Sequence, residues 1–308
     1  MSRLEHVRVA LPFDSLHYTP HYLARALGFF TQEGIEVEQG IPAQGVARAL
    51  LAGDADVGLS GPIRALGALD RGEGQIVCLA EVASRAAFFL LARAAAHDFA
   101  WRDLSGRRVL AFAEAATPRL CLEYLLDRHG VRAGSVEVVP DVPTATAVQH
   151  FLTGRADYLL QGQPLAERLI ASGQAHLVAP LGPALGPLAF SAYLATPRVL
   201  AERTPALDGV LKALARALRW LHGHPPEEIA EQVAPTFPGE ERPVLVSGVR
   251  RLLGGRTWPP DPVLRRPGFD TLLEILLLRG FIKRSYPYDA LVDTSRAEAA
   301  ARAVSGPV

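Results

Sequence analysis

Residues 17 to 22 hold the side chains of this sequence that most readily suggest chemistry, two histidines and two tyrosines around a Thr-Pro step. Histidines four residues apart can share one helix face and bind a metal ion. Here Pro20 favours a helix start between His17 and His21, so the two rings do not share a regular face. No acidic third ligand is fixed nearby, and we predict no metal site. We expect His17 and Tyr18 on the rim of a ligand pocket, and His21 either on that rim or at the surface.

The step Thr19-Pro20 has a counterpart in Thr117-Pro118, and each follows an apolar stretch, residues 7–11 and 108–112. Threonine is a favourable N-cap and proline a favourable first helical residue, so each step is predicted to start a helix. Such helix starts lie beyond the carboxyl ends of parallel strands, where open α/β folds bind ligands. Their free N–H groups favour carboxylate, sulfonate or phosphate oxygens. Ordinary helix capping is the alternative for either threonine.

A longer repeat surrounds these steps. The segment LLAGDADVGLSGP at 50–62 resembles FLTGRADYLLQGQP at 151–164, and Ile35-Glu36-Val37 resembles Val136-Glu137-Val138. Several matches in one order and nearly one register indicate a duplicated unit. The positions that recur at a spacing of 101 are Gly53, Ala55, Asp56, Leu59 and Gly61, matched by Gly154, Ala156, Asp157, Leu160 and Gly162.

Short apolar segments alternate with helical ones along the first 200 residues, which is typical of βαβ units. With the repeat, this pattern predicts an α/β fold of two similar lobes with mainly parallel sheets. We expect residues 1–85 in the first lobe, 86–192 in the second, and 193–308 to return to the first lobe and add mostly helices. Two chain crossings would act as hinges around a ligand cleft.

Two glycine turns, Ser60-Gly61-Pro62 and Gln161-Gly162-Gln163, follow predicted strands and should face this cleft. Arg64, in the first turn of the next helix, and Arg85, at the first crossing, could each bind an anion through two hydrogen bonds. Ion pairing at the surface is the alternative for both arginines. Ser191, at the second crossing, and Gln44, after the second strand, are further candidates.

Composition and motifs exclude several classes. The formal net charge is zero, which argues against a dedicated nucleic-acid binder, and no run of 18 apolar residues could span a membrane. Cys78 and Cys121 form neither a zinc box nor a disulfide framework and are expected as buried hydrophobic residues. No nucleophile elbow, phosphate loop or metalloprotease motif is present. We therefore predict no cofactor and no catalytic residue.

Three segments resemble the solute-binding proteins of ABC importers, in particular the nitrate/sulfonate/taurine type and their thiamine-pyrimidine-precursor relatives. These segments are residues 7–38, 47–62 and 101–112, with ARALGFFTQEGIEVE and L-x-x-G-x-A-D-V-G as the most specific phrases. The resemblance implies a type II periplasmic-binding fold with the ligand between the lobes. By position it places pocket residues at Ser15 to Thr19, Ser60-Gly61, Thr117 and Gln161.

Two functions follow from the sequence. The first is a monomeric binding protein that delivers a small anionic or zwitterionic solute, similar to a sulfonate, taurine or a pyrimidine precursor, to an ABC permease. The start MSRLEHVRVALPF shows no export signal, so this function expects a periplasmic or cell-surface location only if a signal precedes it, and a cytoplasmic one otherwise. The second is a cytoplasmic enzyme or sensor on the same fold, desulfinase-like or thiamine-pyrimidine-synthase-like. The predicted ligand-binding residues are Ser15, His17, Tyr18, Thr19, Gln44, Ser60, Gly61, Arg64, Arg85, Thr117, Gln161 and Ser191.

Overall fold

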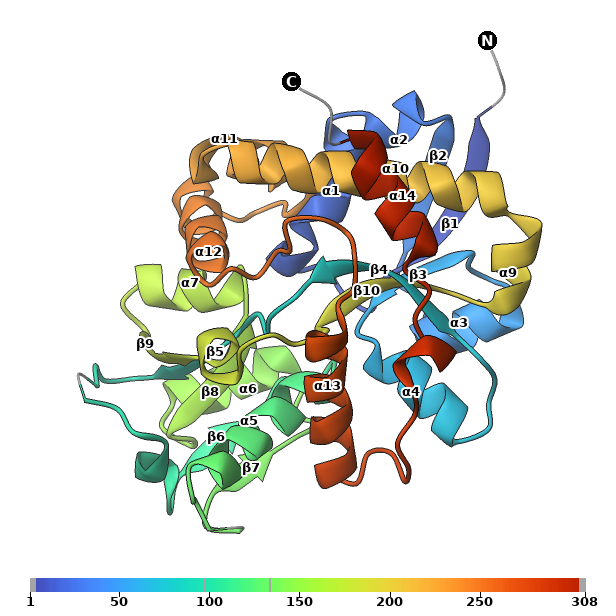
Figure 1. Ribbon diagram of the computed structural model, residues 1–308. Helices are drawn as coiled ribbons and strands as arrows, with labels where there is room; N and C mark the ends of the chain where they lie inside the picture. Colours follow the sequence, from blue (N-terminus) through green and yellow to red (C-terminus); the bar gives the residue numbers. More distant parts are fainter. Residues whose placement is uncertain (1–3, 97, 133, 305–308) are drawn as a thin grey trace.

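The computed structural model describes residues 4–96, 98–132 and 134–304, and these form two α/β lobes around two five-stranded sheets (Figure 1). The prediction of two similar lobes is confirmed. The first sheet has the order β2 (Ile35–Gly40), β1 (Glu5–Ala10), β3 (Val57–Ser60), β10 (Ser191–Ala195) and β4 (Val77–Ala83). The second has the order β7 (Glu137–Val139), β6 (Arg108–Leu110), β8 (Tyr158–Gly162), β5 (Phe88–Ala92) and β9 (His176–Pro180).

Each sheet is mixed, whereas the sequence predicted mainly parallel ones. In the first sheet β1 runs parallel to β2 and β3, but β10 runs antiparallel to β3 and β4. In the second sheet β6 is parallel to β7 and β8, and β5 is antiparallel to β8 and β9. The antiparallel strand in each sheet is the one that arrives from the other lobe. The βαβ pattern predicts only the parallel part because the direction of an entering strand depends on the crossing.

The two crossings run side by side. The first joins β4 to β5 through residues 84–87, and the second joins β9 to β10 through α8 (Leu181–Leu185) and residues 186–190. Backbone hydrogen bonds from Phe190 N–H to the Ala83 carbonyl (3.1 Å) and from Leu188 N–H to the Ser84 carbonyl (2.9 Å) tie them together. Such a paired connection is the usual place of a hinge between lobes.

The sequence repeat corresponds to a structural repeat. In the first lobe Asp56 accepts a hydrogen bond from the backbone N–H of Arg8 on β1, at 2.9 Å. In the second lobe Asp157 accepts one from the backbone N–H of Arg108 on β6, at 2.8 Å. Asp56 therefore fixes the start of β3 against β1, and Asp157 fixes the start of β8 against β6. Both repeats also end a helix with a left-handed glycine, Gly53 at φ 82° and Gly154 at φ 80°.

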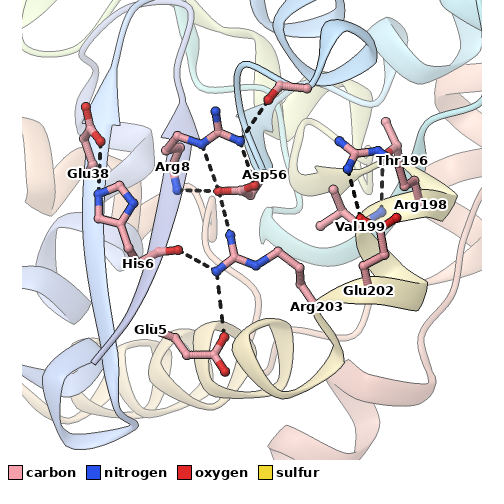
Figure 2. Close-up of polar contacts among 11 residues, drawn as sticks. Glu5, His6, Arg8, Glu38, Asp56, Thr196, Arg198, Val199, Glu202 and Arg203 are labelled. Carbon is pink, nitrogen blue, oxygen red and sulfur yellow. Dashed lines mark hydrogen bonds and ion pairs between the residues drawn. The ribbon is translucent and has the colours of Figure 1, made fainter. Parts of the chain in front are cut away.

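The first copy of this aspartate has an additional role (Figure 2). Asp56 also pairs with the guanidinium groups of Arg8 and Arg203, both at 3.0 Å, and is itself buried. Arg203 immediately precedes α10 (Thr204–Gly223), so this cluster ties the C-terminal helices to the first sheet. Besides its backbone bond, the Asp157 side chain has one further partner among the described residues, a 3.5 Å pairing with Arg107. The two aspartates of the repeat therefore differ in their side-chain partners, and Asp56 also anchors the C-terminal helices.

Helices cover both sheets, and the C-terminal ones contact both lobes. Helix α10 packs against α1 and α2 of the first lobe, whereas α12 packs against α7 and α13 against α5 of the second lobe (Figure 1). Arg168 pairs with Glu240 at 2.9 Å, and Tyr124 donates to Glu274 at 2.9 Å. None of the described helices is both long and apolar enough to cross a membrane. The remaining bounds are α1 (Thr19–Ala26), α2 (Phe29–Gln32), α3 (Val46–Ala52), α4 (Ile63–Asp70), α5 (Ala116–Arg128), α6 (Thr144–Leu152), α7 (Leu165–Ala171), α9 (Pro197–Glu202), α11 (Pro226–Val233), α12 (Arg242–Gly254), α13 (Arg266–Leu278) and α14 (Ser295–Val304).

Candidate ligand-binding cleft

A cavity of about 320 Å³ lies between the lobes, and both lobes and the second crossing, through Phe190, contribute to its wall. The loop after β1 and the turn from β3 into α4 line it from the first lobe, and residues 113–118 at the start of α5 line it from the second. Seven of the residues predicted from the sequence meet there: His17, Tyr18, Ser60, Gly61, Arg64, Thr117 and Ser191.

Arg64 is the cation of this cavity that lacks a counter-charge. It is half-buried, and its Nε donates to the Ser60 hydroxyl at 2.7 Å. Among the described residues no carboxylate pairs with it, and burial lowers the pKa of its guanidinium. Taking an unpaired charge out of water is costly unless a bound anion compensates it. The remaining N–H groups of Arg64 are therefore suited to an anionic ligand group.

Tyr18 and Ser191 complete the polar surface next to Arg64. The Tyr18 side chain is 2% exposed, and burial raises the pKa of its phenol. The Arg64 charge and a hydrogen bond with Ser191 act in the opposite direction but do not overcome burial. Tyr18 is therefore a neutral phenol that can donate to a ligand oxygen.

The second lobe contributes the start of α5. The N-cap residue is Ala115, which has no side chain to satisfy the first N–H groups of the helix, and Ala116 and Thr117 follow it at the cavity wall. Thr117 faces Gly61 of the first lobe, because a Cβ placed on Gly61 would lie 3.7 Å from the Thr117 hydroxyl oxygen and 3.1 Å from the Phe190 carbonyl. A side chain at position 61 would close this space. Free helix N–H groups add a partial positive charge to that of Arg64.

The predicted capping role of the two threonines is wrong. Helix α1 has Tyr18 as its N-cap and α5 has Ala115, with no side-chain capping bond at either end. A 3-10 turn, Leu16–Tyr18, precedes α1, and the Thr19 hydroxyl donates back to the Leu16 carbonyl at 2.7 Å. Thr19 is fully buried and lies outside the cavity wall, whereas Thr117 lines it without a hydroxyl partner among the described residues.

His17 and His21 lie in different surroundings. His17 lines the cavity at 2% exposure, with its Nδ1 2.7 Å from the Ser15 hydroxyl oxygen. His21 is fully buried between Tyr193 (2.7 Å) and Gln39 (3.2 Å), so its predicted place at the rim or surface is wrong. Burial lowers the pKa of His17 to about 3 and that of His21 to about 4, so both rings are neutral.

Aromatic rings that the sequence did not single out form much of the remaining wall. Phe13, Phe88 and Phe190 line the cavity. The ring of Phe112 lies 5.0 Å from that of Phe13 and 4.9 Å from that of Phe88, so aromatic contacts connect the two lobes. Apolar side chains next to strands are expected in the core. The signal that could have predicted Phe13, Phe88 and Phe190 at the cleft is their position, just after β1 and next to the two crossings.

The other predicted residues lie elsewhere. Ser15 is buried behind His17, and exposed Gln44 donates to Asp54 at 3.0 Å. Arg85 lines a separate cavity of about 350 Å³ beside the crossings. Gln161 is 2% exposed on β8, and its amide nitrogen has no partner among the described residues.

Groups for metal or thiol chemistry are not gathered at the cleft. Within the described residues, no three His, Cys, Asp or Glu side chains are arranged to hold a metal ion. Cys78 and Cys121 are fully buried away from the cavity, and burial raises the pKa of each thiol to about 12. Neither cysteine is available as a nucleophile for a ligand in the cleft.

Residues 15–228, more than half of the chain, match the family described as NMT1/THI5 like. The chain belongs to the NMT1/THI5-like family. It is 25% identical over 303 residues to YtlA of Bacillus subtilis (strain 168), which is named as a candidate binding protein, and the match covers 96% of this chain and 90% of YtlA. The sequence-based resemblance is thereby confirmed.

Solved structures share the fold of this NMT1/THI5-like protein. One is the ligand-binding component of an ABC-type import system from Staphylococcus aureus with zinc bound, at a TM-score of 0.79 and 13% identity, covering 97% of this chain and 99% of that one. Another is the alkanesulfonate-binding protein SsuA from Xanthomonas axonopodis pv. citri bound to MOPS. Its TM-score is 0.75 and its sequence identity 17%, and the match covers 96% of this chain and 100% of that one. At these identities the likeness establishes the fold, and the predicted periplasmic-binding fold is confirmed.

Proposed function

We propose that this protein binds a small organic anion in the interlobe cleft and delivers it to an ABC importer. The observation that carries the proposal is the half-buried Arg64, which faces the cavity without a carboxylate partner among the described residues. The family, the fold and the name of the Bacillus relative support a binding role. Delivery implies a permease as partner, and we propose a monomer that acts in the periplasm or at the cell surface.

The cavity favours an anion with an apolar or aromatic body. Arg64, Ser60, Tyr18, Thr117 and the start of α5 all offer hydrogen-bond donors, which suit the oxygens of a sulfonate or carboxylate. The phenylalanine rings offer apolar and edge-to-face contacts to the rest of the molecule. A sulfonate is the first class to test, because a structural neighbour is named as an alkanesulfonate-binding protein. Pyrimidine precursors and taurine-like zwitterions come next.

An enzyme on the same fold is the less favoured alternative. Both cysteines are buried away from the cleft, with their pKa raised to about 12. The pKa of His17, about 3, lies far from that of a general base poised near neutral pH. The cavity therefore offers groups that bind and orient a ligand rather than a constellation for bond cleavage.

The experiment is a thermal-shift screen of alkyl and aryl sulfonates, aromatic carboxylates and pyrimidines, followed by calorimetric titration of the best ligand into two variants. Arg64→Gln removes the cavity arginine that has no carboxylate partner among the described residues, and Arg85→Gln, the matched control, removes the other arginine predicted from the sequence. Loss of hydrogen bonds to a charged group costs about 1.5–3 kcal/mol, or roughly 10- to 150-fold in affinity. We expect that loss for Arg64→Gln and less than about a twofold change for Arg85→Gln. The reverse pattern would place the anion site at the crossing and refute the proposal.

A further inference from the structure

The hydroxyl of Ser15 lies between two groups that compete for its single proton. Its oxygen is 3.1 Å from the backbone carbonyl of Gln163 and 2.7 Å from Nδ1 of His17. A carbonyl oxygen can only accept, and a serine hydroxyl has one proton to donate. Both hydrogen bonds form together only when Ser15 donates to Gln163 and the Nδ1–H of His17 donates to Ser15. This arrangement leaves Nε2 of His17 with its lone pair.

The Gln163 carbonyl comes from the other lobe. It follows β8 of the second sheet, whereas Ser15 and Leu16 follow β1 of the first. The same carbonyl also accepts the backbone N–H of Leu16 at 3.2 Å. The contact that orients the Ser15 proton is therefore a contact between the lobes, and it depends on their juxtaposition around the cleft.

Contacts with neighbouring residues fix the position of the His17 ring, which leaves its tautomer as the property that can differ. Its ring is 4.0 Å from that of Tyr18 and 5.4 Å from that of Phe190, and its backbone carbonyl accepts the indole N–H of Trp258 at 3.0 Å. Burial keeps the ring neutral, with its pKa at about 3. Nε2 has no hydrogen-bond partner among the described residues, and the ring lines the cavity. Nε2 is thus the nitrogen left to meet a ligand.

We propose that Ser15 and the Gln163 carbonyl determine specificity by holding His17 as the Nδ1–H tautomer, so that Nε2 accepts a hydrogen bond from the ligand. The groups around Arg64 donate, and His17 accepts. The selected ligand then carries an N–H or O–H donor in addition to its anionic group. This inference rests on the proposed function for the ligand, but the tautomer itself is a property of the protein alone.

The tautomer is measured by ¹⁵N NMR of the histidine-labelled protein at pH 7, with the His17 signals assigned from the His17→Gln spectrum. We expect a protonated Nδ1 and an unprotonated Nε2. Ser15→Ala should shift the ring towards a mixture of tautomers, Ser15→Thr should restore the parent state, and Ser172→Ala, a matched control whose hydroxyl donates to the Leu169 carbonyl, should leave it unchanged. A predominant Nε2–H tautomer in the parent, or an unaltered tautomer in a folded Ser15→Ala protein, overturns the assignment.

The specificity is measured with benzenesulfonate and its hydroxy- and amino-substituted isomers. One neutral hydrogen bond of about 1 kcal/mol corresponds to roughly fivefold in affinity. We expect the best donor-bearing isomer to bind about fivefold more tightly than benzenesulfonate in the parent and less than twofold more tightly in Ser15→Ala. An equal preference in both proteins overturns the specificity role. If no probe binds while NMR shows the Nδ1–H tautomer, the aryl sulfonate class fails and the tautomer assignment stands.

Discussion

Thr19 and Thr117 look alike in the sequence but should respond differently to the same substitution. Thr19 is fully buried, and its hydroxyl donates to the Leu16 carbonyl at 2.7 Å. Thr117 is 5% exposed, and its hydroxyl faces the cavity without a partner among the described residues. We expect Thr19→Ala to lower stability and keep affinity, and Thr117→Ala to lower affinity and keep stability.

The magnitudes follow from these surroundings. Thr19→Ala loses one hydrogen bond, worth about 0.5–1.5 kcal/mol, and one buried methyl group, worth about 0.8 kcal/mol. In a protein of this size the sum, about 1–2.5 kcal/mol, corresponds to a melting temperature roughly 2–7 °C lower. Thr117→Ala loses a hydrogen bond to an anionic ligand, about 1.5–3 kcal/mol, so its dissociation constant should rise roughly 10- to 150-fold.

The assay combines calorimetric melting of the ligand-free variants with titration of the ligand found in the screen, at a temperature where every variant is folded. Thr19→Ser and Thr117→Ser keep the hydroxyl and serve as controls. We expect both to retain most of the parent behaviour. A Thr117→Ala protein that binds like the parent, or a Thr19→Ala protein that loses binding at unchanged stability, would refute the assignment of the cavity wall.

Two further predictions concern stability. Asp56→Asn should lower the free energy of unfolding in urea by roughly 2–4 kcal/mol, because buried Asp56 binds two guanidinium groups and a backbone N–H. Asp157→Asn should lower it by about 1 kcal/mol. Equal losses would contradict the different roles of the two aspartates. As the pH falls below about 6.5, His17 and His21 take up protons in the unfolded chain but not in the folded one. Each histidine should therefore lower the free energy of unfolding by about 1.4 kcal/mol per pH unit of acidification. Glu81, whose pKa burial raises to about 8, acts in the opposite sense, since the folded protein keeps a proton that the unfolded chain releases between pH 4.5 and 8. Urea unfolding at pH 5, 6.5 and 8 should show a maximum near 6.5, and Glu81→Gln should abolish the decline above it.

The sequence by itself determined the two-lobe architecture and part of the cavity wall in each lobe. Alternating apolar segments and the repeat at a spacing of 101 are local signals, and strand ends of parallel units lie at one edge of their sheet. That is why Ser60, Gly61 and Thr117, each just after a strand, could be predicted at the cleft and are found there. Their position depends only on the order of elements within one lobe.

Tertiary structure decided the rest, because it depends on contacts between residues far apart in the chain. Arg64 and Arg85 are equivalent candidates in the sequence, yet only Arg64 lines the cavity, while Arg85 faces a separate one beside the crossings. His21 became a core residue once Tyr193, 172 positions away, came to lie against it. The Ser15 hydroxyl meets a carbonyl 148 positions away, so the hydrogen-bonding state of His17 is set by the closeness of the two lobes, which no local pattern encodes.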